Sequence, residues 1–401
     1  MFRSLRKLIS SERYYNIYRI MLTAFGLWPY QTSSVMKLQA IFFLGAYCFI
    51  LVFQCTIFLT ATCNLEFIIK ELSYIFITVL YIVSYNSYYF NSNGVKYLLE
   101  QIKLDWNTME DNSEIRILEK YAFEICFRSL ILGFFVICCI FSVIFIELIP
   151  VILDAVAPMN ESRPRKIKMD FEFFIDEQKY FYIYLIYEII VILLGIFTIL
   201  ATGTLSMAFL QHCCATIKIA SNLIKNIVTK HTLETPAHRR THVMYRNINR
   251  AVHIHRKSLQ FSTFLMKIMN KWYFFIIIFS VMSLTCNLFR LLNALKTLKE
   301  LSEVLMSIGL ILGHFIIIFV PNLVGQSLTD HSAEIFNAAY STMWYLAPLS
   351  IQKLLLFVMQ NSLKSHVLTI GRIYISSLEG FSTLTTTAIS YFTVIYAVTM
   401  N

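Results

Sequence analysis

The chain has 401 residues, of which 57% are hydrophobic and only 14% are charged, and its mean hydropathy is +0.62. Soluble domains carry about 25% charged residues, so this composition excludes a soluble globule and requires a surface that faces lipid. The formal net charge of +10 does not indicate a nucleic-acid binder, because the basic residues are not interleaved with the aromatic platform of a soluble fold.

The N-terminal segment, residues 1–31, is basic and aromatic and lacks the apolar core and cleavage site of a signal peptide. It predicts a cytosolic or interfacial helix, and seven apolar runs follow, each long enough to cross about 30 Å of hydrocarbon. The predicted spans are 38–62, 68–90, 129–153, 181–210, 270–293, 302–324 and 374–398. The sequence therefore predicts an all-α membrane protein that forms one seven-transmembrane domain over residues 1–401.

Lys and Arg residues are distributed unevenly between the loops of this topology. With the N-terminus in the cytosol, 24 of the 34 lie in cytosolic segments and 8 lie in outside loops, which is the bias of the positive-inside rule. Asn160, in the sequence Asn160-Glu161-Ser162, is a candidate glycosylation site in a loop that this topology places outside. The sequence predicts a cytosolic N-terminus and an extracellular C-terminus, the inverse of a G-protein-coupled receptor.

The outer halves of the second, third, fourth and sixth predicted spans combine aromatic, hydroxyl and small side chains. Such residues could enclose an apolar cavity with a few polar groups, as small-molecule pockets do. Ordinary packing of the bundle is an equal alternative for any single residue. The candidate ligand-binding residues are Tyr74, Thr78, Phe141, Phe145, Tyr184, Tyr187, Met306 and Leu310.

Ionisable residues within or near the spans are candidates for function by default. They form no Arg ladder and no obvious proton relay, which excludes a voltage sensor and weakens a pump. Most lie near span ends, where their side chains could reach water. These residues are Lys70, Glu71, Glu147, Glu188, His314 and Glu379. The chain has no nucleophile–base motif, phosphate loop or CxxC spacing, so we expect no enzyme activity, metal site or cofactor.

The last predicted span is rich in Ser and Thr, which either allow close helix packing or line a water-filled path. Residues 349–360, before it, are apolar but too short to cross a bilayer. Six residues recur at alternating spacings of four and three, the pattern of one helix face: Gly380, Leu384, Thr387, Tyr391, Val394 and Val398. Val394 and Val398 on this face could form a gate that closes by dewetting. An ordinary helix–helix seam is the alternative.

Several segments together resemble insect odorant receptors over nearly the full length, most closely those of ants, bees and wasps. The strongest are WYLAPLSIQKLLLFVMQNS, LTIGRIYISSLEGFSTL and SYFTVIY, and the matching ranges are 26–31, 148–165, 207–224, 344–362, 368–384 and 390–396. Gln326 departs from the common family pattern at its position.

This resemblance implies a split seventh helix and a hetero-tetrameric, ligand-gated cation channel in the plasma membrane of olfactory neurons. The last helix of each subunit would line the pore, with Val394 and Val398 at the gate. The modest loop at 211–269 resembles the variable, odorant-binding subunit rather than the longer shared co-receptor. The partners would be that co-receptor and a small volatile or cuticular ligand. A gustatory-type channel and a secondary transporter are the alternatives.

Overall fold

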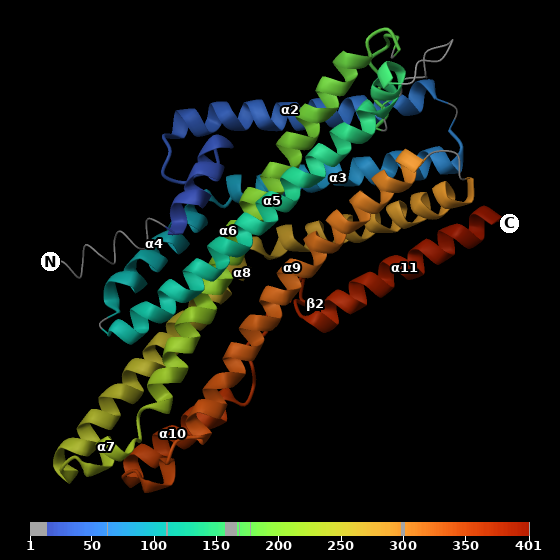
Figure 1. Cartoon of the computed structure of the whole chain (residues 1–401). Coiled ribbons are helices and arrows are strands. Elements are labelled where there is room, and N and C mark those ends of the chain that lie inside the picture. The colour runs from blue at the N-terminus through green and yellow to red at the C-terminus, as the bar shows by residue number, and fades with distance from the viewer. Residues whose placement is uncertain are drawn as a thin grey trace.

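The computed structural model describes residues 14–61, 63–109, 111–156, 167, 169–176, 178–297 and 301–400, so Asn160 lies outside the described residues. Figure 1 shows an elongated bundle of long helices. A first helix covers residues 14–24. The following helices are α2 (Ser33–Thr60), α3 (Leu65–Tyr89), α4 (Ser92–Thr108), α5 (Asn112–Val156), α6 (Phe181–Lys225), α7 (Lys230–Glu234), α8 (Ala237–Thr297), α9 (Leu301–Tyr340), η1 (Trp344–Leu346), α10 (Leu349–Ser362) and α11 (Leu378–Met400).

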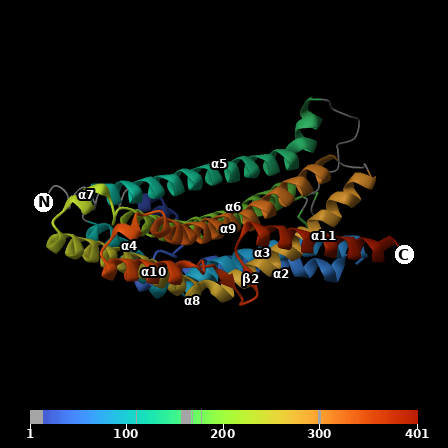
Figure 2. The ribbon, with the colours of Figure 1, turned by 90° about the horizontal axis from the view of Figure 1, so that it is seen from below.

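Seven helices of the described chain are long and apolar enough to cross a membrane, namely α2, α3, α5, α6, α8, α9 and α11. Each of them overlaps one predicted span. Four of these helices are much longer than their spans: α5 and α6 have 45 residues, α8 has 61 and α9 has 40. At 1.5 Å per residue they measure about 60 to 92 Å, so they extend well beyond about 30 Å of hydrocarbon. Their extensions meet at the end of the bundle that carries α7 and α10 (Figure 2).

A buried ionic cluster fixes α4 to the extended parts of α6 and α8. Asp105 of α4 lies 3.0 Å from His212 Nε2 of α6 and 2.5 Å from Lys257 Nζ of α8. Burial raises the pKa of the Asp105 carboxyl, but hydrogen bonds and charge from His212 and Lys257 outweigh burial and lower this pKa below its ordinary value. The cluster therefore stabilises the packing of these three helices as long as Asp105 is ionised.

The seventh helix is split, as the sequence predicted. Between α10 and α11 lies a two-stranded antiparallel hairpin, β1 (Thr369–Ile370) and β2 (Tyr374–Ile375), which hydropathy did not predict. Gly371 and Arg372 both have φ of 63° in its loop, a conformation that glycine adopts at no steric cost and arginine rarely adopts.

The hairpin and the start of α11 dock closely against α9 at Gly325. A Cβ at Gly325 would lie 2.4 Å from the carbonyl oxygen and Oγ of Ser376. Ser376 Oγ donates to the carbonyl of Pro321 at 3.1 Å, and the Ser377 amide donates to Asn322 Oδ1 at 3.0 Å. The absence of a side chain at Gly325 thus permits the contact that sets the direction of α11.

Candidate functional site

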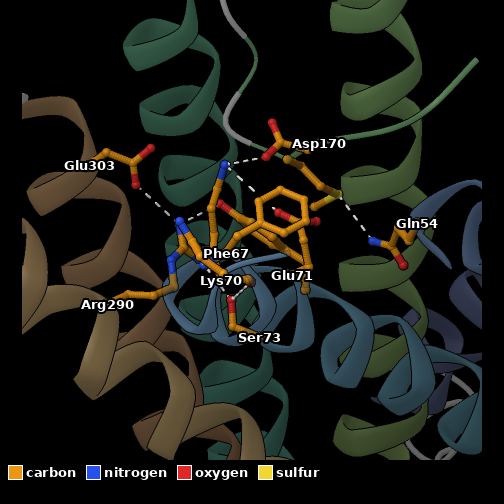
Figure 3. A network of polar contacts seen from close by, with 11 residues as sticks. Gln54, Phe67, Lys70, Glu71, Ser73, Asp170, Arg290 and Glu303 are labelled. Carbon is orange, nitrogen blue, oxygen red and sulfur yellow. Dashed lines mark hydrogen bonds and ion pairs between the residues drawn. The ribbon is translucent and has the colours of Figure 1, made fainter. Parts of the chain in front are cut away.

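Arg290 of α8 is the centre of a buried polar network that joins three helices (Figure 3). Its guanidinium donates hydrogen bonds to Ser73 Oγ at 2.9 Å and the Tyr74 hydroxyl at 2.8 Å, and it pairs with Glu303 Oε2 of α9 at 3.3 Å. The guanidinium carbon lies 4.5 Å from the centroid of the Tyr74 ring, a distance at which a cation–π contact is favourable. Because only 6% of Arg290 is exposed, the network links α3, α8 and α9 inside the bundle.

The loop between α5 and α6 closes this network from one end of the bundle. Asp170 of the loop binds Lys70 Nζ of α3 at 2.6 Å. Met169 Sδ accepts a hydrogen bond from Gln54 Nε2 at 3.5 Å, and Gln54 Oε1 accepts one from Thr78 Oγ1 at 2.8 Å. Figure 3 shows Asp170 above the α3 residues and Gln54 to their right. The loop therefore contributes side chains to the same interior as α2 and α3.

Aromatic residues of the same loop pack against the start of α6. The ring centroid of Phe173 lies 4.9 Å from that of Tyr184 and 4.9 Å from that of Tyr187, and Phe171 lies 4.8 Å from Tyr187. The Tyr184 hydroxyl donates to the carbonyl of Ile175 at 3.1 Å. This aromatic group therefore covers the start of α6 with apolar side chains of the loop.

The structure buries or half-buries six of the eight candidate ligand-binding residues and exposes two. Buried in the bundle are Tyr74, Thr78, Tyr184 and Met306, with Tyr187 and Leu310 half-buried. Phe141 and Phe145 lie on the outward face of α5, with 68% and 60% of their surface exposed. The first six therefore lie inside the bundle, whereas the two phenylalanines are placed to contact lipid.

The ionisable candidates lie deeper than the sequence suggested. Glu71, Glu147, Glu188 and His314 are all at most 3% exposed, so the expectation that such side chains reach water was wrong for them. The physical reason is that the α5–α6 loop and the neighbouring helices cover this end of the bundle. Sequence reasoning missed Asp170, Arg290 and Glu303; Arg290, one of two charges inside the predicted span 270–293, was the available signal.

Helix α11 lies at the edge of the bundle (Figure 1), and 11% of its most apolar window is buried. Tyr391, Val394 and Val398 are 56%, 61% and 66% exposed, whereas Gly380 and Leu384 are buried and Thr387 is half-buried. The predicted stripe thus starts in contact with the bundle and ends on a free surface. Six hydroxyls of α11 donate to carbonyls of the same helix: those of Thr383, Thr385, Thr387, Ser390, Thr393 and Thr399.

Helix α8 contacts both the Arg290 network and α11 within one turn. Ser283 Oγ donates to the carbonyl of Ser73 in α3 at 3.0 Å. Two residues further, Thr285 Oγ1 donates to the carbonyl of Ala388 in α11 at 3.3 Å. Helix α8 is thus hydrogen-bonded directly to both α3 and α11, and the Thr285 hydroxyl also lies 2.9 Å from the Val281 carbonyl of its own helix.

A groove of about 310 Å³ lies between α2 and α6 on the membrane-facing surface. Its walls are apolar and include Phe49, Ile190 and the ring of Tyr187. Tyr187 therefore contacts the interior aromatic group on one side and this groove on the other. Among the described residues, no group of three or more His, Cys, Asp or Glu side chains is arranged to hold a metal ion.

Comparison with known proteins agrees with this architecture. A family model described as 7tm odorant receptor matches residues 64–389. The olfactory receptor OR5 of the insect Machilis hrabei in complex with eugenol has a similar structure, with a TM-score of 0.76, 14% identity, and coverage of 97% of this chain and 99% of that one. The structure of OR5 alone gives a TM-score of 0.74, 15% identity, and 98% coverage of each chain. No curated protein sequence matched the chain.

Proposed function

Because the chain belongs to the 7tm odorant receptor family, we propose that it is the odorant-binding subunit of a ligand-gated cation channel that assembles with a shared co-receptor. It is a multi-pass plasma-membrane receptor and not an enzyme. In the proposed assembly the N-terminus is cytosolic, as the excess of Lys and Arg in the corresponding loops favours.

The observation that carries this proposal is the free surface of α11. A helix whose exposed face bears many hydroxyl groups gains little from contact with lipid, but it suits a water-filled path. Four copies of this face around an axis would enclose such a path, with the exposed Val394 and Val398 at one mouth. A ring of valines there would close the path by excluding water.

The proposed odorant site lies between α3, α6 and α9, where Tyr74, Tyr184 and Met306 are buried and Tyr74 belongs to the Arg290 network. The Machilis receptor OR5 was solved with eugenol, so a protein of this fold can hold a small aromatic ligand. In this chain a ligand that binds one arrangement of α3 and α8 more tightly shifts the population of that arrangement. The hydrogen bonds of Ser283 and Thr285 would then pass the shift to α11.

The test is whole-cell current in cells that express this chain with and without the co-receptor, with G-protein signalling blocked. We expect odorant-evoked cation current only with both subunits present. Current that depends on G proteins, or silence of the well-trafficked pair to a broad odorant and hydrocarbon panel, would contradict the proposal.

Val394→Ala and Val398→Ala test the gate separately. A smaller side chain weakens the hydrophobic barrier, so each variant should raise the current measured without odorant. Ile389→Ala, at a position of α11 that is 47% exposed but outside the predicted stripe, is the control and should leave this basal current unchanged. Equal basal currents in the wild type and both valine variants would rule out a gate at these positions.

A further inference from the structure

A small cavity lies between α4, α5, α6 and the first helix, next to the buried ionic cluster of α4, α6 and α8. Its volume is about 10 Å³, and the residues that line it include Tyr15, Trp106, Tyr121, Gln211 and His212. This volume is far too small for an odorant or a lipid chain, but it is close to the volume that one water molecule needs.

The space for this cavity comes from short side chains on two neighbouring helices. Ala208 and Ala215 of α6 lie three residues before Gln211 and four residues after it, and Ala122 of α5 also lines the cavity. Residues at spacings of three and four share one face of a helix, so the two alanines of α6 lie on the same face as Gln211. The alanines therefore leave room beside its longer side chain.

The ion pair between α4 and α6 accompanies two further polar side chains at the cavity. His212 Nε2 lies 3.0 Å from Asp105 Oδ2. Trp106 directly follows Asp105 in α4, Gln211 directly precedes His212 in α6, and both of these neighbours line the cavity. The same contact between α4 and α6 thus brings an indole and an amide to one small space.

The indole and the amide each carry a buried polar atom that has no hydrogen-bond partner within the described part of the chain. Trp106 is 2% exposed and Gln211 is 3% exposed. The two atoms are Trp106 Nε1 and Gln211 Oε1, which do not bond to each other. The indole N–H only donates a hydrogen bond and the amide oxygen only accepts one. Leaving either group unpaired in the interior is unfavourable, so a partner that serves both is expected.

The chemistry of these two atoms decides what that partner is. A cation would satisfy the amide oxygen but not the indole N–H, and an anion would do the reverse. A water molecule accepts one hydrogen bond and donates another, and buried waters make about three hydrogen bonds to polar groups that lack other partners. The volume of the cavity and the nature of its polar atoms therefore lead to the same ligand.

We propose that this cavity is the binding site of one ordered water molecule, which accepts a hydrogen bond from Trp106 Nε1 and donates one to Gln211 Oε1. The water gives α4 and α6 a second polar link beside the pair of Asp105 and His212. It belongs to the folded receptor and depends neither on an odorant nor on channel opening.

The first test is a structure of the assembled, full-length receptor at a resolution that shows ordered waters. We expect one isolated density peak within about 2.7–3.2 Å of both Trp106 Nε1 and Gln211 Oε1. A direct hydrogen bond between the two side chains would overturn the proposal. So would the lack of a peak at this place in a map that shows other buried waters.

The second test is Gln211→Met, which removes the acceptor and keeps a side chain of similar length. The peak should disappear, and the thermal unfolding midpoint should fall by on the order of 2–4 °C because the Trp106 N–H is left unpaired. Gln260→Met, at an exposed position of α8, is the matched control and should change neither the peak nor the midpoint. A peak that persists in Gln211→Met would refute the assignment, and the test on the wild type stands even if this variant does not fold.

Discussion

Replacing Tyr74 with Phe removes one hydroxyl from the Arg290 network and keeps the aromatic ring. The hydroxyl accepts a hydrogen bond from Arg290 at 2.8 Å, while the cation–π contact at 4.5 Å involves only the ring. Hydrogen bonds to charged groups contribute about 1.5–3 kcal/mol in soluble proteins, but interhelical hydrogen bonds in membranes average about 0.6 kcal/mol and reach about 1.7. We therefore expect Tyr74→Phe to cost about 1 kcal/mol.

A double-mutant cycle with Arg290→Lys isolates this contact. Lysine keeps the positive charge but loses the planar fork that reaches Ser73, Tyr74 and Glu303 together. The loss of stability in the double variant should be smaller than the sum of the two single losses by about 1 kcal/mol. The assay is unfolding of the purified receptor in detergent micelles with increasing SDS.

The control cycle pairs Arg290→Lys with Tyr88→Phe. The Tyr88 hydroxyl lies within 2.7–2.9 Å of Ser206 Oγ and the Thr202 carbonyl, and Tyr88 is 14 residues, or about 21 Å, along α3 from Tyr74. These two changes should be additive. If Tyr74→Phe and Arg290→Lys also add within about 0.3 kcal/mol, the network does not couple α3 to α8 and the reasoning above is wrong.

Three further predictions concern the contact of α9 with α11, the Asp105 cluster and the hydrogen bond between α8 and α11. Gly325→Ala should lower the thermal midpoint of the purified receptor, because its Cβ would overlap Ser376, whereas Gly309→Ala on the same helix, where a Cβ meets nothing within 4 Å, should not. Asp105→Asn should cost about 3 kcal/mol at neutral pH, since it breaks a buried ion pair. The lowered pKa of Asp105 means that its stabilisation is present above about pH 4 and is lost as the pH falls further, so the wild type should lose stability below about pH 4 more steeply than Asp105→Asn in a pH series of thermal midpoints. Thr285→Val should lower the maximal odorant-evoked current and leave ligand affinity unchanged, and an unchanged maximal current would exclude this hydrogen bond from the coupling.

Hydropathy alone predicted the seven spans because each run must satisfy the length of the hydrocarbon core. It did not predict how far the helices continue, since polar extensions such as residues 237–269 of α8 carry no hydropathy signal. The strands of the hairpin were not predicted for a related reason. Each strand has only two residues, too few to show an alternating pattern: Thr369–Ile370 and Tyr374–Ile375.

Which side of each span contacts protein and which side contacts lipid was harder to predict than where the span lies in the sequence. A span that is apolar on all sides has no periodicity that separates protein contact from lipid contact. Phe141 and Phe145 were therefore grouped with Tyr74 and Tyr184, although α5 turns them outward. Polar residues gave better guidance, because Glu71, Glu188 and the stripe of α11 could be recognised as unusual in hydrocarbon before their neighbours were known.

The internal hydrogen bonds of α11 bear on how the protein is made. Of the seven membrane-spanning candidates this helix has the lowest window hydropathy, 1.3 against 2.9 for α5, so its insertion by the translocon is the least favourable. Because Thr383, Thr387 and Ser390 already donate to carbonyls of the same helix, their hydroxyls enter the bilayer with their donors satisfied. A newly synthesised subunit can thus be inserted before it assembles, and in the proposed assembly the same hydroxyls would face water.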